Sequence, residues 1–268
     1  MRAHLAQIIT VANQKGGVGK TTSTMNLGVA LARMGRRVLL VDSDPQANLT
    51  SYLGIQPGTG AAEQTRTLDE MYLSKRTPVS LIEAKHYVVQ TGSGVDLVPC
   101  DRGLSGVEYY LFSKPQKELV LGKFLGLLRS EYDVILIDTP PSLNLLTLNA
   151  LCASQKVLVP VQPEFFSLEG IVKIRQTIAE VRAGWNPELE IAGVLPTQVA
   201  PRRSLTSEVL EALRGELGEL LFEARIHEAA AVTESSGHAV SVFDYDRSSR
   251  GAKDYQEAAL ELDRRLFS

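Results

Sequence analysis

The sequence has few cysteines, and they do not suggest a cross-linked or cluster-binding protein. Only Cys100 and Cys152 occur in 268 residues, and they form no paired motif. This pattern argues against a disulfide framework and predicts two buried thiols in a reducing compartment. The four histidines are scattered along the chain and lack the spacing of metal ligands.

Long apolar runs and a strong charge of either sign are also missing. No hydrophobic run is long enough to span a bilayer, and the N-terminus lacks the basic-then-apolar pattern of a signal peptide. The sequence therefore predicts a cytoplasmic protein that does not bind membranes. Its formal net charge is -3, so contact with nucleic acid would require a local basic patch.

The order of apolar segments predicts one α/β domain over residues 1–268. At 44% hydrophobic and 22% charged residues, the composition suits a single domain with a sizeable core. Continuous apolar runs are typical of strands covered on both faces, and alternating strands and helices favour a doubly wound, mostly parallel sheet with helices on both sides. The expected strands are Ile8–Ala12, Val38–Val41, Val95–Val98, Val134–Ile137, Val157–Val161 and Ile191–Leu195. The expected helices include Thr21–Met34, Leu119–Leu128 and Leu168–Val181, and Gln56–Thr67 is expected to be a surface loop.

A glycine-rich segment between the first strand and the first helix carries the strongest chemical signal. Its glycines allow the backbone to curl so that N–H groups face phosphate oxygens, and the helix N-terminus adds its dipole. Lys20 would face the β- and γ-phosphates, and the Thr21 hydroxyl would bind Mg²⁺. A plain strand-to-helix turn is the alternative, but the complete motif in this context favours a P-loop NTPase. The predicted phosphate-binding residues are Lys15, Gly16, Gly17, Val18, Gly19, Lys20, Thr21 and Thr22.

Lys15 is unusual because a P-loop does not require a lysine at its first position. The residue stands on the strand side of the loop, where its side chain could reach out of its own site. A solvated surface lysine is an equally good interpretation of the position alone.

Two predicted strands end in acidic residues. Asp42 and Asp44 follow the second strand, and Asp138 follows the strand Val134–Ile137. Doubly wound sheets bind ligands at the carboxyl ends of their strands. Asp138 and Asp42 therefore fit a role in holding Mg²⁺, and Asp44 could orient an attacking water molecule. Aspartates at strand ends also form turns and helix caps, but two such strands beside a P-loop favour the functional interpretation.

These motifs resemble those of the ParA/MinD group of deviant Walker ATPases. The likeness rests on residues 15–22, 42–46 and 138–142. Further segments resemble the ParA-type chromosome and plasmid partition ATPases in their short, Soj-like form, which lacks an N-terminal helix-turn-helix domain. They are residues 137–150 (IDTPPSLNLLTLNA), 159–170 (VPVQPEFFSLEG), 193–197 followed by Arg202, and 245–255 (YDRSSRGAKDY).

The resemblance implies a function as well as a fold. Lys15 is then a catalytic residue that crosses a dimer interface to the partner's nucleotide, so that two subunits enclose two ATP molecules with Mg²⁺. Asp44 is implied to position the hydrolytic water. The ATP-bound homodimer is implied to bind double-stranded DNA without sequence preference, and a ParB-like centromere-binding protein is implied to stimulate hydrolysis. Such a protein would be associated with the nucleoid.

The resemblance also implies contacts with the base and with DNA, and the sequence departs from the family pattern there. Pro196, Thr197 and His227 are implied to lie near adenine, but residues 227–231 read HEAAA where short ParA proteins commonly carry Pro-Arg-Asn-Val-Arg. The asparagine and the second arginine of that pattern are thus alanines here. The implied DNA-binding residues are Arg202, Arg203, Arg247, Arg250 and Lys253, each of which could equally be a solvated surface charge.

Three alternative functions differ in what they require of the sequence. A MinD-like membrane ATPase would need a basic amphipathic helix at the C-terminus. The last helix has an apolar stripe at Tyr255, Ala259, Leu262 and Leu266, but its other face mixes both charges, as expected for a helix packed on its own domain. A small-molecule enzyme of the same superfamily is a further alternative. An iron–sulfur reductase would need cluster-ligating cysteines that Cys100 and Cys152 do not provide.

Overall fold

The computed structural model describes residues 5–74, 76–164, 167–200 and 204–267 and places seven strands in one sheet. The order across the sheet is β3-β4-β2-β5-β1-β6-β7, and every pair is parallel except β3 with β4. The six predicted strands are confirmed to within two residues. β3 was not predicted, because two residues are too short for a pattern. The strands are β1 (Gln7–Val11), β2 (Val38–Asp42), β3 (Val89–Gln90), β4 (Asp96–Val98), β5 (Val134–Asp138), β6 (Lys156–Val161) and β7 (Glu190–Pro196).

Helices occupy the connections between these strands. The longest are α1 (Lys20–Arg33), α8 (Ser167–Gly184), α9 (Ser204–Leu217) and α12 (Arg250–Phe267). The shorter α-helices are α2 (Asn48–Tyr52), α3 (Leu68–Leu73), α4 (Leu81–Lys85), α5 (Leu104–Leu111), α6 (Val120–Leu128), α7 (Leu145–Ala153), α10 (Ala230–Gly237) and α11 (Val242–Tyr245). Single 3₁₀ turns are η1 (Gly60–Ala62), η2 (Lys117–Leu119) and η3 (Gly218–Leu220).

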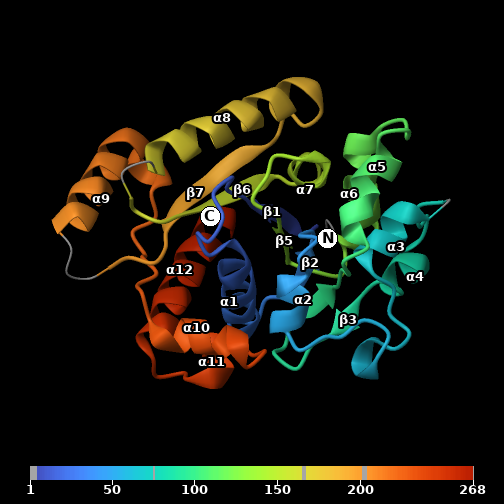
Figure 1. The fold of residues 1–268 in the computed structure, drawn as a ribbon, viewed down its shortest axis with the longest axis horizontal. Helices are drawn as coiled ribbons and strands as arrows, with labels where there is room; N and C mark the ends of the chain where they lie inside the picture. The colour runs from blue at the N-terminus through green and yellow to red at the C-terminus, as the bar shows by residue number, and fades with distance from the viewer. Residues whose placement is uncertain (1–4, 75, 165–166, 201–203, 268) are drawn as a thin grey trace.

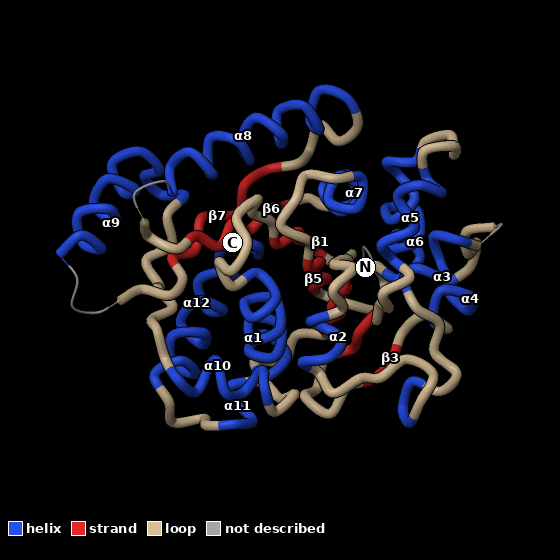
Figure 2. The backbone as a smooth tube through the Cα atoms, in the orientation of Figure 1, coloured by secondary structure: helices blue, strands red, loops and turns tan. Residues whose placement is uncertain are grey.

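The sheet lies between two layers of helices, as the continuous apolar strands predict (Figure 1). Alternate residues of β2 show the division: Leu40 packs into a core with residues of α1 and α12, whereas Leu39 and Val41 pack with residues of α3, α5 and α6. A third core joins β6 and β7 to α8 and α9. Figure 2 shows the strands in the middle of the molecule, with helices on both sides. The predicted α/β architecture is therefore confirmed.

The register of the sheet brings the predicted acidic residues together. β2 pairs with β5 so that Asp42 lies beside Asp138, and β1 pairs with β5 so that Val11 also lies beside Asp138. Since all three strands are parallel, the P-loop that follows Val11 opens at the edge of the sheet where both carboxylates stand.

Three lesser predictions have mixed outcomes. Residues 56–67 form a largely exposed connection, but Ala62 in η1 is buried in the core that also contains Val89 of β3, so the segment is not entirely a surface loop. Cys100 is buried, whereas Cys152 is only half-buried, and both thiols are free. In the described part of the chain, no helix is both long and apolar enough to cross a membrane.

Candidate nucleotide-binding site

Two glycines shape the loop between β1 and α1. Gly17 has φ 75° and Gly19 has φ 80°, and side chains other than hydrogen strain the backbone in this left-handed region. Gly16 has no positive φ, and a Cβ on it would meet only the Pro141 Cβ at 3.9 Å. The left-handed backbone of the loop therefore rests on Gly17 and Gly19. Gly19 caps α1 without a side-chain hydrogen bond, which leaves the first N–H groups of the helix available to an anion.

Lys20 holds an ammonium group in the interior of this loop. The side chain is buried, and its Nζ donates to the Lys15 carbonyl oxygen at 3.2 Å. Burial lowers the pKa of Lys20, although the carboxylates of Asp138 and Asp44 act in the opposite direction. A buried cation gains from an anionic partner, and a phosphate in the loop would supply one.

The paired carboxylates have different surroundings. Asp42 Oδ2 accepts hydrogen bonds from the Thr50 backbone N–H at 2.8 Å and from Thr50 Oγ1 at 2.6 Å. Burial nevertheless raises the pKa of Asp42 to about 6. Asp138 Oδ2 is buried without any hydrogen-bond partner. Burial and the neighbouring Asp42 raise the pKa of Asp138, while a hydrogen bond from Thr21 lowers it.

This arrangement fits a magnesium ion. Mg²⁺ commonly binds through one or two carboxylates together with substrate phosphates and water. No group of three His, Cys, Asp or Glu side chains suited to a metal occurs among the described residues. An ion at this site would therefore also need ligands from phosphate and water. The unpartnered oxygen of Asp138, with Thr21 and Asp42 close by, provides oxygen ligands that a phosphate-bound ion could use.

Asp44 lies just beyond the pair and is held by its own turn. Its Oδ1 accepts from the Gln46 backbone N–H at 3.0 Å, and its backbone N–H donates to Asp42 Oδ1 at 3.3 Å. The Cys100 thiol donates to the Asp44 carbonyl oxygen at 3.1 Å, and the Cys100 backbone N–H donates to Thr50 Oγ1. Thr50 and Cys100 therefore support both acids, a role that no motif in the sequence indicates.

The Lys15 side chain points out of the loop. Its Nζ forms an ion pair with Glu164 Oε2 at 2.6 Å, and both side chains are about half exposed. Glu164 was not predicted, although it falls within the segment 159–170 that carries the family resemblance. The ion pair holds the Lys15 side chain at the surface, while its backbone carbonyl oxygen still accepts from Lys20 inside the loop.

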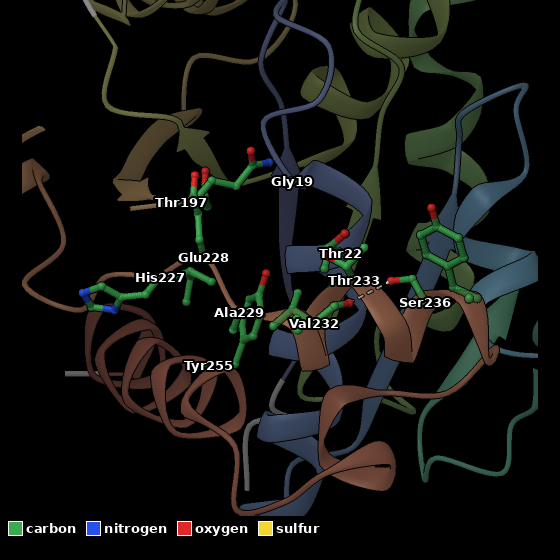
Figure 3. A pocket seen from close by; sticks show the side chains of 15 residues that line it. Gly19, Thr22, Thr197, His227, Glu228, Ala229, Val232, Thr233, Ser236 and Tyr255 are labelled. Carbon is green, nitrogen blue, oxygen red and sulfur yellow. Dashed lines mark hydrogen bonds between the residues drawn. The ribbon is translucent and has the colours of Figure 1, made fainter. Parts of the chain in front are cut away.

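A cavity of about 680 Å³ extends from the P-loop (Figure 3). Gly19 and Thr22 line one end, together with Thr197, whose Oγ1 donates to the Val18 carbonyl oxygen at 2.8 Å. His227 also lines the cavity, but its ring points away from Thr22 and Ala229 (Figure 3) and contacts Asp254. The remaining lining residues are Tyr52, Gln198, Ile226, Glu228, Ala229, Ala230, Val232, Thr233, Ser236, Gly237 and Tyr255.

Two of the three predicted adenine neighbours therefore lie at this cavity. Pro196 is the exception: it ends β7, is buried, and is not part of the lining. Gln198 lies there instead, in the left-handed region at φ 51°, and its Nε2 donates to the Gly17 carbonyl oxygen at 2.5 Å. Sequence reasoning missed this contact because a left-handed glutamine leaves no sequence signature.

The predicted DNA-binding residues are described only in part. Arg202 and Arg203 lie outside the described residues. Arg247, Arg250 and Lys253 are exposed and follow one another closely at the start of α12. Their role in DNA binding stays a prediction.

The C-terminal helix packs on its own domain. Tyr255, Ala259 and Leu262 are buried in the core shared with α1, and Leu266 packs against the same core. The apolar stripe of α12 is thus covered, in agreement with the sequence-based interpretation and unlike a helix that offers this stripe to a membrane.

Comparison with known proteins agrees with the motifs. The AAA domain family model matches residues 6–191. The chromosome partitioning protein ParA of Caulobacter vibrioides is 39% identical over 264 residues, which cover 98% of this chain and 96% of that protein. The sporulation initiation inhibitor protein Soj of Bacillus subtilis is 37% identical over 258 residues, covering 96% and 98%.

A solved structure extends the likeness to the fold. Cobyrinic acid a,c-diamide synthase from Mycobacterium smegmatis, crystallised with an ATP analog and magnesium, superposes with a TM-score of 0.84 at 35% identity over 98% of this chain and 96% of that one. The P-loop, the paired strand-end acids and the full-length similarity to ParA and Soj point the same way. The chain belongs to the ParA/Soj family of partition ATPases.

Proposed function

We propose that the chain hydrolyses ATP with Mg²⁺ and uses the nucleotide to switch its binding to DNA during partition. The observation that carries the proposal is the buried Lys20 in a loop curled by Gly17 and Gly19, opposite a buried Asp138 oxygen that has no partner. The loop N–H groups and Lys20 bind the phosphates, while Thr21, Asp138 and Asp42 hold the ion. Asp44 orients the attacking water, and the base enters the cavity beside Thr197 and His227.

The active form is a homodimer in which Lys15 reaches the nucleotide of the partner. In the single chain Lys15 is bound to Glu164, and an exposed ion pair of this kind contributes about 0–1 kcal/mol. Such a weak contact holds the side chain at the surface and can be exchanged for a phosphate across the interface at little cost.

Lys15→Gln is expected to slow hydrolysis by about tenfold or more while leaving ATP affinity of the monomer within about twofold. The reason is that a contact across the interface exists only in the dimer, and a charge near the reacting phosphate acts mainly in the transition state. Sedimentation with ATP and single-turnover hydrolysis measure the two effects. Glu164→Gln is the matched control, since it breaks the ion pair and keeps the lysine. Unaltered dimerisation and hydrolysis in Lys15→Gln would make Lys15 an ordinary surface charge.

DNA binding follows from dimerisation. A single chain with net charge -3 and few clustered cations should hold DNA poorly, because non-specific affinity comes from neutralised phosphates. Two copies of the basic residues on one two-fold-related surface act together and raise the effective concentration of the second contact. Hydrolysis, stimulated by a ParB-like centromere-binding protein, dissolves the dimer and releases the DNA. The protein is then cytoplasmic and associated with the nucleoid.

Arg202→Glu combined with Arg203→Glu is expected to reduce the affinity for random-sequence duplex DNA and to flatten its salt dependence. Each lost phosphate contact should lower the slope of log affinity against log salt by about one unit. A titration with ATP and with ADP across a salt series measures both quantities. Equal binding with ADP and ATP in the unmodified protein, or an unchanged slope in the variant, contradicts the proposal. Pelleting with anionic vesicles under the same conditions tests the membrane alternative.

A further inference from the structure

Asp254 is a buried carboxylate that the proposed ATPase chemistry does not use. It lies on the first turns of α12 and is 7% exposed. Its Oδ2 accepts a hydrogen bond from the His227 backbone N–H at 2.8 Å and lies 2.9 Å from His227 Nδ1. One oxygen thus binds both the main chain and the ring of a residue that lines the nucleotide cavity.

The segment held by Asp254 forms a wall of that cavity. Residues 226–229 all belong to the lining. The same segment pairs with the chain beyond β7: the Val199 backbone N–H donates to the Ile226 carbonyl oxygen at 3.0 Å, and the Glu228 backbone N–H donates to the Val199 carbonyl oxygen at 3.2 Å. The wall is therefore fixed on one side by backbone pairing and on the other by Asp254.

Two side-chain hydrogen bonds connect this wall to the P-loop. Thr197 and Gln198, which directly precede Val199, bond to the carbonyl oxygens of Val18 and Gly17. Tyr255, next to Asp254, lines the cavity and places its hydroxyl 3.4 Å from Ser23 Oγ on α1. A continuous set of contacts thus runs from the phosphate loop through residues 197–199 and 226–228 to Asp254, and from α1 back to Tyr255.

The start of α12 is also where three exposed cations gather. Arg247, Arg250 and Lys253 precede Asp254 within seven residues. This turn packs closely on α10, since a Cβ on Gly251 would overlap the Val232 side chain, and Val232 lines the cavity as well. Because this turn packs directly against residues that line the cavity, a displacement of the cavity wall should also displace the turn.

We infer that Asp254 is a positioning residue through which nucleotide in the cavity fixes the basic first turns of α12. The inference rests on the proposed nucleotide site. It states that nucleotide bound there determines the position of the exposed surface at the start of α12. The surface recognises a polyanion through Arg247, Arg250 and Lys253.

Hydrogen exchange of the α12 amides tests this assignment without requiring DNA. The unmodified protein is compared alone, with ADP, and with a non-hydrolysable ATP analogue and Mg²⁺ at saturation. We expect nucleotide to slow exchange at the start of α12, and Asp254→Ala to remove most of this difference. Asp254→Asn should retain it, because an amide oxygen still accepts from the His227 N–H. Asp263→Ala is the matched control. Asp263 lies on the same helix as Asp254, and its substitution breaks an ion pair with Arg36 that is away from the cavity.

The outcomes separate the inference from the proposed function. An unmodified protein that binds the analogue yet shows no exchange difference at the start of α12 overturns the inference, and this result does not depend on how well Asp254→Ala folds. An equal response in Asp254→Ala and the unmodified protein overturns it as well. If nucleotide slows exchange at the start of α12 but the protein binds no DNA, the inference is supported and the proposed DNA switch is contradicted. If the protein binds DNA, the ratio of its DNA affinity with the ATP analogue to its DNA affinity with ADP should fall by about fivefold in Asp254→Ala. A change of this size corresponds to the loss of about one buried hydrogen bond.

Discussion

Lys20→Ala is expected to weaken ATP binding by about 100-fold or more. The side chain is buried, bonds to the Lys15 carbonyl oxygen and lies near the acids Asp138 and Asp44, so its ammonium is placed to pair with a phosphate bound in the loop. Removing one partner from a buried, hydrogen-bonded charge pair costs about 2–5 kcal/mol, and about 1.4 kcal/mol corresponds to tenfold in affinity. Titration with a fluorescent ATP analogue and Mg²⁺ measures the loss.

The control for this variant is another lysine of the same loop. Lys15→Ala removes an equal charge from a half-exposed position and should leave monomer affinity nearly unchanged. Comparison of melting temperatures without nucleotide shows whether Lys20→Ala is folded. A folded Lys20→Ala protein that binds ATP and Mg²⁺ with near-native affinity would refute the P-loop assignment.

Asp44→Ala is expected to reduce hydrolysis by about 100-fold or more while ATP binding and dimerisation persist. A positioned base or water-orienting group contributes about 10²–10⁴ to a rate, and Asp44 contacts its own turn and Asp42 without lying in the phosphate loop. The variant should therefore accumulate as an ATP-bound dimer. Single-turnover hydrolysis and sedimentation with ATP measure the two properties.

Asp44→Asn separates the charge from the fold of the turn. Its amide oxygen can still accept from the Gln46 backbone N–H, so the turn should be preserved while the carboxylate is lost. Equal loss of hydrolysis in both variants assigns the effect to the charge. If either variant hydrolyses ATP at the native single-turnover rate, Asp44 is not the residue that positions water.

The arrangement of the fold could be predicted because its signals are local and repeated. Continuous apolar runs such as Val134–Ile137 indicate burial on both faces of the sheet, and the parallel order follows from the helices between the strands. β3 carries no such signal, since Val89 and Gln90 become a strand only by pairing with β4. The buried place of Ala62 is likewise decided by tertiary packing.

The site could be predicted where a motif fixes the chemistry, and not where distant segments meet. Lys20 and Asp138 belong to motifs at strand ends, and the sheet register brings them together. Thr50 bonds to Asp42, Glu164 to Lys15 and Gln198 to Gly17. The partners in these contacts are separated by 8, 149 and 181 positions in the sequence. No spacing rule relates such residues.

The packing of α12 against α1 has a consequence for the order in which the molecule is built. Gly19 and Tyr255 line one cavity but lie near opposite ends of the chain. Synthesis proceeds at about 5–20 residues per second, so the phosphate loop leaves the ribosome roughly ten to fifty seconds before the helix that completes its cavity. During that interval the apolar face of α1 that later meets α12 is uncovered, and nucleotide cannot yet stabilise the complete pocket. A chaperone that shields α1 would be needed most in this interval.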